Sequence, residues 1–114
     1  MEHKTPTRRP ACIVHTMPDP DELQLNSFGE IDGILEVRCE TPNHPTFQVQ
    51  FQGCNPFNDI PDAVFDGSIE SPVVIPLNKT GPFVYFIQHF HKSGKPSKLW
   101  GPHPCSIHSC GPCR

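Results

Sequence analysis

Proline is the sequence feature that most limits what this chain can fold into. The 114 residues include 15 prolines, which recur from Pro6 to Pro112, and 8 glycines. Inside a helix, proline removes a backbone N–H donor, and its ring clashes with the preceding turn. The chain is therefore expected to form short strands joined by turns, with little or no helix.

Two segments alternate apolar and polar side chains with the period of a β-strand. In residues 46–52, Phe47, Val49 and Phe51 alternate with three glutamines, and residues 33–39 alternate in the same way. A period of two places successive side chains on opposite faces of a strand. Each segment is therefore predicted to be a strand with one face in the core.

Further strands are predicted from shorter apolar runs that lie between turn residues. They are expected at residues 12–17, 63–66, 72–77 and 82–92, whereas residues 19–25 could hold one helical turn. Several short strands separated by turns are typical of a sandwich or a barrel. We predict an all-β protein, a small antiparallel β-sandwich, and both an immunoglobulin-like and a cupredoxin-like sandwich fit the number of strands.

The core and the organisation of the chain follow from the same pattern. The core should contain one apolar face of residues 83–90 together with Leu35, Val37, Phe47, Val49, Phe51, Val73 and Ile75. Residues 1–10 are expected to form a disordered arm, and residues 11–100 the sandwich. Residues 101–114 are expected to form a separate segment that is rich in cysteine and histidine.

Composition narrows the expected partners and compartment. The formal net charge of −3 and the lack of a lysine or arginine cluster argue against nucleic acid as a partner. No segment reaches the roughly 20 apolar residues that span a membrane, so no membrane partner is expected. The first residues lack the apolar centre of a signal peptide, which predicts a cytoplasmic protein, or a secreted one if a leader was removed. Another protein could dock on a sheet face or edge.

The C-terminal segment is the part of the sequence that indicates a chemistry. Five of its residues can ligate a soft metal: His103, Cys105, His108, Cys110 and Cys113. Cys110 and Cys113 enclose Gly111-Pro112, a turn that can direct two thiolates at one ion. In a reducing cytoplasm, cysteines act as thiols or ligands more often than as disulfides. A copper or zinc ion is therefore the expected cofactor.

One residue, Ser109, separates the two Cys/His pairs of this segment. A single residue spans only about 3.5 Å, so four ligands drawn from the segment alone would require a strained loop. The folded domain is expected to complete the site, and its candidate ligands are His44, His89 and His91, with Cys39 and Cys54 as further ones. An exposed end of the long strand explains His89 and His91 at least as well.

Two short motifs resemble known families. His44 precedes a predicted strand, and Cys105-x-x-His108 follows late in the chain. This arrangement resembles the copper ligands of cupredoxins, and the resemblance implies a sandwich fold with Cys113 at the axial position. Cys110-Gly-Pro-Cys113 is similar to the active-site tetrapeptide of thioredoxins, which implies a dithiol that exchanges with a disulfide.

Three functions remain open at this stage. The sequence has no nucleophile elbow, P-loop, dinucleotide fingerprint or zinc-protease helix, which favours a role other than catalysis. We predict a small metal-binding β-sandwich that holds copper or zinc in its C-terminal Cys/His cluster. The alternatives are an interaction module with a redox-active dithiol at Cys110 and Cys113, and the same module with purely structural cysteines.

Overall fold

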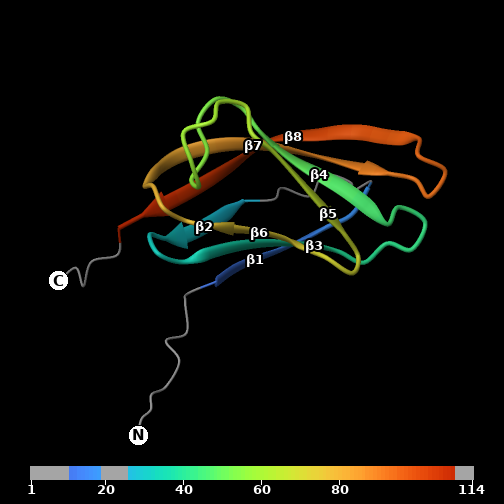
Figure 1. Cartoon of the computed structure of the whole chain (residues 1–114), viewed down its shortest axis with the longest axis horizontal. Helices are drawn as coiled ribbons and strands as arrows, with labels where there is room; N and C mark the ends of the chain where they lie inside the picture. Colours follow the sequence, from blue (N-terminus) through green and yellow to red (C-terminus); the bar gives the residue numbers. More distant parts are fainter. Residues whose placement is uncertain (1–10, 19–25, 110–114) are drawn as a thin grey trace, which may run out of the picture.

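The computed structural model describes residues 11–18 and 26–109, and this part of the chain forms eight β-strands and no helix (Figure 1). The strands are β1 (Ala11–Thr16), β2 (Ser27–Glu30), β3 (Ile34–Cys39), β4 (Thr46–Phe51), β5 (Val64–Ser68), β6 (Val73–Pro76), β7 (Gly81–Phe90) and β8 (Pro96–His108). The all-β class is confirmed. The helical turn predicted at residues 19–25 lies outside the described residues. Within the described ranges, no helix is long and apolar enough to cross a membrane.

The strands form two sheets that face each other across the core (Figure 1). One sheet has the strand order β1-β3-β6, and the other has the order β2-β8-β7-β4-β5. Both sheets are mixed rather than purely antiparallel, because the edge strands β1 and β2 run parallel to β3 and β8. Turn residues in the sequence predict antiparallel hairpins, because a short turn joins the two strands. Parallel neighbours are joined by longer crossover connections, which leave no local pattern. The parallel pairs were therefore absent from the sequence prediction.

The inner faces of the two sheets form one core. The seven residues predicted for it from β3, β4 and β6 are all buried, with exposed fractions of 3% or less. On β7 the inner face consists of Phe83, Tyr85, Ile87 and His89, and the opposite face is half-buried from Val84 onward. The alternation in the sequence therefore identified the core correctly.

The last strand, β8, contains an irregularity that decides which of its side chains face inward. Its register against β7 shifts between the pair Trp100–Ile87 and the pair His103–Tyr85, so that β8 holds one extra residue. An extra residue reverses the faces of the strand beyond it. Gly101 lies at this point with a φ of 145°, and a β-carbon there would lie 2.5 Å from an aromatic ring. Beyond it, every second residue from His103 to Ile107 faces the core.

Two parts of the five-stranded sheet differ from the sequence prediction. Residues 101–108, which the sequence assigned to a segment outside the sandwich, are the second half of β8 and pair with both β7 and β2. Their prolines, histidines and cysteines do not form a recognisable strand pattern. β2 was also not predicted. Its one large apolar side chain, Phe28, is 63% exposed, so the strand has no large apolar side chain on its inner face that a sequence pattern could reveal.

Candidate functional site

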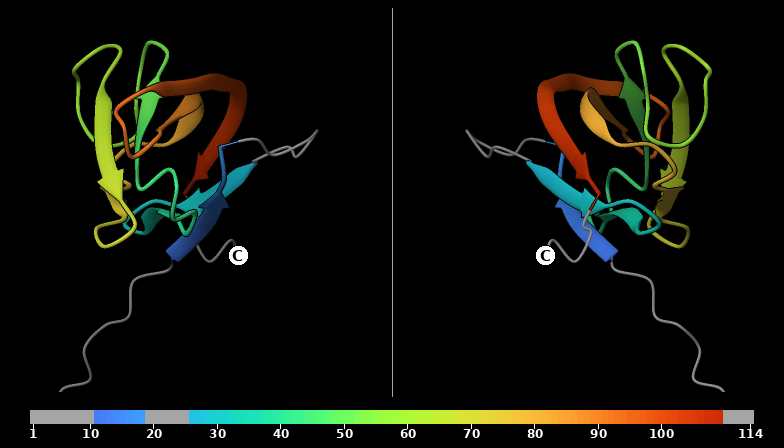
Figure 2. Two further views of the ribbon diagram at one scale, coloured as in Figure 1. Left: turned by 90° about the vertical axis from the view of Figure 1, so that its right-hand side faces the viewer. Right: turned by 90° about the vertical axis from the view of Figure 1, so that its left-hand side faces the viewer.

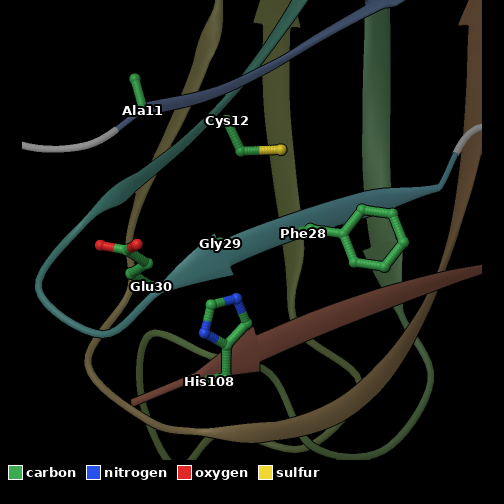
Figure 3. Close-up of a pocket in the computed structure, with 6 residues that line it drawn as sticks. All are labelled: Ala11, Cys12, Phe28, Gly29, Glu30 and His108. Atoms are coloured by element: carbon green, nitrogen blue, oxygen red, sulfur yellow. The ribbon is translucent and has the colours of Figure 1, made fainter. Parts of the chain in front are cut away.

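The edges of the two sheets meet at one corner of the molecule, where β1 lies beside β2 without pairing with it. The end of β8 reaches the same corner (Figure 2). A pocket of about 210 Å³ opens there, lined by Ala11, Cys12, Phe28, Gly29, Glu30 and His108 (Figure 3). We refer to it as the seam pocket. It contains a thiol, a carboxylate and an imidazole, each from a different strand.

Glu30 and His108 occupy paired positions on neighbouring strands at the seam pocket. They are register partners in the parallel pair of β2 and β8, so their side chains leave the sheet on the same face. Neighbouring strands lie about 4.8 Å apart, so the two side chains start from adjacent positions in the sheet. The amide of Ile31 donates a hydrogen bond of 2.9 Å to the His108 carbonyl and extends this pairing by one residue. Cys12 lies on the other side of β2 in Figure 3.

Cys105 and His108 do not form the chelating pair that their spacing suggests. Both lie in β8, and residues three positions apart in a strand point to opposite faces. Cys105 is fully buried in the core, whereas His108 is exposed. Burial raises the pKa of the Cys105 thiol to about 11, and the Ser27 hydroxyl opposes this to a smaller extent. The thiolate form, which binds metals, is therefore disfavoured at Cys105.

His103 also faces the core, on the side of β8 opposite to His108. It is 6% exposed, and its ring centroid lies 5.3 Å from that of Tyr85. Its Nε2 is buried without a hydrogen-bond partner. Burial lowers the pKa of His103, so the neutral ring is favoured in this position. His103 is therefore in the core and is separated from His108, which is exposed at the end of the same strand.

The three histidines predicted from the body of the domain come together at the other end of β7. Antiparallel pairing of β4 with β7 sets Phe47 against His89, and this brings the turn that contains His44 beside the end of β7. The ring centroids of His44 and His91 are 5.2 Å apart, with the rings nearly perpendicular. We refer to His44, His89 and His91 as the histidine cluster.

His89 is buried, and the alternative of an exposed strand end is wrong for it. Its exposed fraction is 0%, because β7 is a central strand, and its ring stacks on Phe47 with centroids 5.8 Å apart. Burial lowers the pKa of His89 to about 4, with a smaller contribution from His44, so the ring is neutral at neutral pH. Neither ring nitrogen has a hydrogen-bond partner. An unpaired buried N–H costs about 1–3 kcal/mol.

Of the remaining candidate ligands that the structure describes, Cys39 lies beside His44, whereas Cys54 lies at neither place. Cys39 is buried, and its thiol donates a hydrogen bond of 3.4 Å to the His44 carbonyl. Cys54 is exposed in the loop between β4 and β5. Cys110 and Cys113, the predicted metal and redox pair, lie outside the described residues. Within residues 11–18 and 26–109, no three His, Cys, Asp or Glu side chains are placed to hold a metal ion.

Sequence reasoning did not select Cys12 or Glu30, which the structure places around His108. The two residues lie near the opposite end of the chain from His108, in strands with no recognisable ligand spacing. Only the parallel pairing of β2 with β8, and the contact of β1 with β2, bring them to the seam pocket. The sequence contains no local pattern that predicts parallel pairing between strands so far apart in the chain.

Thiol reactivity should follow the exposure of each cysteine. We expect an alkylating reagent to label Cys54 first among the described cysteines and half-buried Cys12 next, with Cys39 and Cys105 protected until the domain unfolds. In the metal-free protein Cys110 and Cys113 should also react before Cys39. Mass spectrometry of peptides after short labelling times measures this order. Early labelling of Cys105 would contradict its placement in the core.

Comparison with known proteins adds no family to this description. No protein-family model matches the chain, and neither the curated proteins nor the solved structures contain a match. The resemblance of His44 and Cys105-x-x-His108 to cupredoxins stays a prediction.

Proposed function

We propose that this protein binds a zinc ion at the seam pocket, with two ligands from the sheet and two from the residues that follow β8. The observation that carries the proposal is the side-by-side position of Glu30 and His108 at the point where β8 ends. The sequence continues directly into the C-x-x-C pair of Cys110 and Cys113. The proposed ligands are therefore Glu30, His108, Cys110 and Cys113.

The length of the chain allows both thiols to reach this pair. Cys110 follows His108 by two residues and Cys113 by five. An extended chain covers at most about 3.6 Å per residue. The Cα atom of Cys110 can therefore be no more than roughly 7 Å from that of His108, and the Cα atom of Cys113 no more than roughly 18 Å. A turn at Gly111-Pro112 suits the return of the second thiol towards the first.

The chemistry of the ligands favours zinc over copper(I). Zinc accepts thiolate, imidazole and carboxylate ligands together, usually four in tetrahedral geometry. Copper(I) prefers soft ligands and would be expected to replace the carboxylate with a further thiolate. Cys105 is not available for this role, because it is buried on the opposite face of β8. Four protein ligands would leave no open position, so the proposed site stabilises structure and binds no substrate.

The zinc content of cysteine variants tests the proposal. Protein purified under reducing conditions without a histidine tag should lose one equivalent of zinc when Cys110 and Cys113 are both replaced by serine. Cys54→Ser removes an exposed thiol elsewhere and should leave the content unchanged. Glu30→Gln should weaken binding by about tenfold or more, because it removes the negative charge of a ligand, whereas Cys12→Ser should not. Elemental analysis and competition with a chelator measure both quantities.

Two results would contradict the proposal. Equal zinc content in the wild type and in the Cys110→Ser/Cys113→Ser variant would place the metal elsewhere. A metal-free wild type whose Cys110 and Cys113 form a disulfide on mild oxidation would favour the dithiol interaction module instead. Circular dichroism should show the same β-sheet signal for all variants, because Cys12, Glu30 and Cys54 are not among the buried residues of the core.

A further inference from the structure

Another pocket lies at the end of the sandwich where the chain turns from β7 into β8. The amide of Lys92 donates a hydrogen bond of 3.0 Å to the carbonyl of Asn43, which holds this turn beside the turn before β4 (Figure 1). The pocket has a volume of about 350 Å³ and is lined by Pro18, His44, Ser97, Lys98 and Trp100. We refer to it as the tryptophan pocket.

The tryptophan pocket is separate from the seam pocket. Trp100 pairs with Ile87 of β7, whereas Ile107, which precedes His108 of the seam pocket, pairs with Gly81. Ile87 follows Gly81 by six positions, which corresponds to roughly 20 Å at about 3.3 Å per residue. A ligand of the tryptophan pocket would therefore be independent of zinc at the seam pocket.

Trp100 gives the pocket a fixed apolar wall. The indole ring is half-buried, and its Nε1 donates a hydrogen bond of 2.6 Å to the carbonyl of Pro18. This bond satisfies the polar atom of the side chain and sets the direction of the ring, so that the rest of the indole offers a flat apolar surface. Pro18 adds a second apolar side chain to the same lining.

Lys98 supplies a positive charge at this wall. Its Nζ lies 4.6 Å from the centroid of the Trp100 ring, within the range of a cation–π interaction. The contact holds the ammonium at the pocket instead of leaving it extended into solvent. Within residues 11–18 and 26–109, Lys98 forms no ion pair, so its charge is available to an anionic ligand.

The distribution of charge along the chain favours an anion at this end of the molecule. All 12 aspartates and glutamates precede residue 71, so β7 and β8 contain none, and no described residue of the pocket lining is acidic. Lys92 and Lys95 lie in the turn that joins the two strands, close in sequence to Lys98. The formal net charge of the whole chain is −3, so this positive charge is a local feature that attracts anions.

His44 offers a hydrogen-bond donor to the same pocket. Its Nδ1 is buried without a partner, and a hydrogen on that nitrogen would be an unpaired buried donor, which costs free energy. The tautomer with hydrogen on Nε2 is therefore favoured in the neutral ring. Nε2–H is then the group that His44 can donate to a ligand in the pocket that its ring lines.

We infer that the tryptophan pocket binds a small organic carboxylate. The carboxylate pairs with the Lys98 ammonium and accepts a hydrogen bond from His44, and the apolar part of the ligand contacts Trp100 and Pro18. Pockets of about 300–1,000 Å³ hold small molecules, and the volume of about 350 Å³ lies in this range. An inorganic anion alone would leave the apolar wall in contact with water, so an organic ligand suits the lining better.

Fluorescence of Trp100 tests this inference directly, because it is the one tryptophan of the chain. Benzoate is the probe, and we expect it to change the fluorescence of the full-length protein in a saturable way. Benzamide has the same size without the charge, and acetate has the charge without the ring. Both should bind at least about threefold more weakly than benzoate. No saturable change with benzoate, or equal binding of benzamide, would overturn the inference.

Substitutions of lysine give the second readout. Lys98→Met keeps the length of the side chain and should lower the affinity for benzoate by about three- to tenfold, whereas Lys98→Arg should retain it. Lys79→Met is the matched control, because it removes an ion-paired lysine outside the pocket. Unchanged affinity in Lys98→Met would overturn the inference. Benzoate binding that appears only when Asp19, Asp21 and Glu22 are neutralised together would also overturn it, because carboxylates of the chain itself would then be the ligand.

Discussion

Replacement of Phe47 by alanine is expected to lower the free energy of unfolding by about 3–5 kcal/mol. Phe47 is 1% exposed on the inner face of β4, where its ring stacks on His89. The ring also fills the space left by Gly67, at which a β-carbon would lie 2.6 Å from it. Because neighbouring strands fix this space, the surrounding side chains can close the resulting cavity only in part. Urea denaturation followed by circular dichroism measures the loss.

The matched control for Phe47→Ala is a phenylalanine of the same sheet that is not buried. Phe28 on β2 is 63% exposed, and Phe28→Ala should change the stability by no more than about 0.5 kcal/mol. A loss below about 1 kcal/mol for Phe47→Ala, or equal losses for the two variants, would contradict the packing of β4 against the core.

Asn55→Ala is expected to produce the second large loss of stability, about 2–4 kcal/mol. Asn55 is fully buried in the loop after β4. Its Oδ1 accepts hydrogen bonds from the amides of Phe57 and Asn58, and its Nδ2 donates to the Ile60 carbonyl and the Asn58 side chain, all at 2.8–3.0 Å. Each bond contributes about 1 kcal/mol, and a buried group left unpaired costs more than that.

Two comparisons separate this hydrogen-bond network from a general effect of mutation. Asn55→Asp keeps the two acceptor contacts but sets a buried carboxylate oxygen against the Ile60 carbonyl and the Asn58 side-chain oxygen, so its cost should be at least that of Asn55→Ala. Asn43 is exposed in the turn before β4, and Asn43→Ala should change stability little. The same denaturation experiment measures all three variants. Full stability of Asn55→Ala would mean that the loop holds its shape without these bonds.

The sequence was sufficient to predict the strands that have one apolar face. Phe47, Val49 and Phe51 alternate with glutamines in β4, and a side-chain period of two has one structural explanation. The same reasoning correctly placed Leu35 and Val37 of β3 in the core. In each case the information is local, because the alternation of neighbouring residues shows which face of the strand is buried.

The candidate sites could be predicted only in part, because they depend on pairings between distant segments. The bulge at Gly101 sets which side of β8 faces the core and so places Cys105 inside, and the spacing of three residues then places His108 on the opposite face. The parallel pairing of β2 with β8 brings Glu30 to His108. The sequence did indicate His44, His89 and His91 as candidate ligands. It could not indicate that His89 would be buried without a hydrogen-bond partner.

X-ray absorption at the zinc edge is the most direct test of the proposed zinc site. The account predicts sulfur scatterers at about 2.3 Å, together with nitrogen or oxygen at about 2.0–2.1 Å, in protein loaded with zinc under reducing conditions. The sulfur signal should disappear in the Cys110→Ser/Cys113→Ser variant and should persist in His89→Phe. A zinc spectrum of the wild type with no sulfur scatterers would contradict the proposal that the thiols after β8 bind the metal.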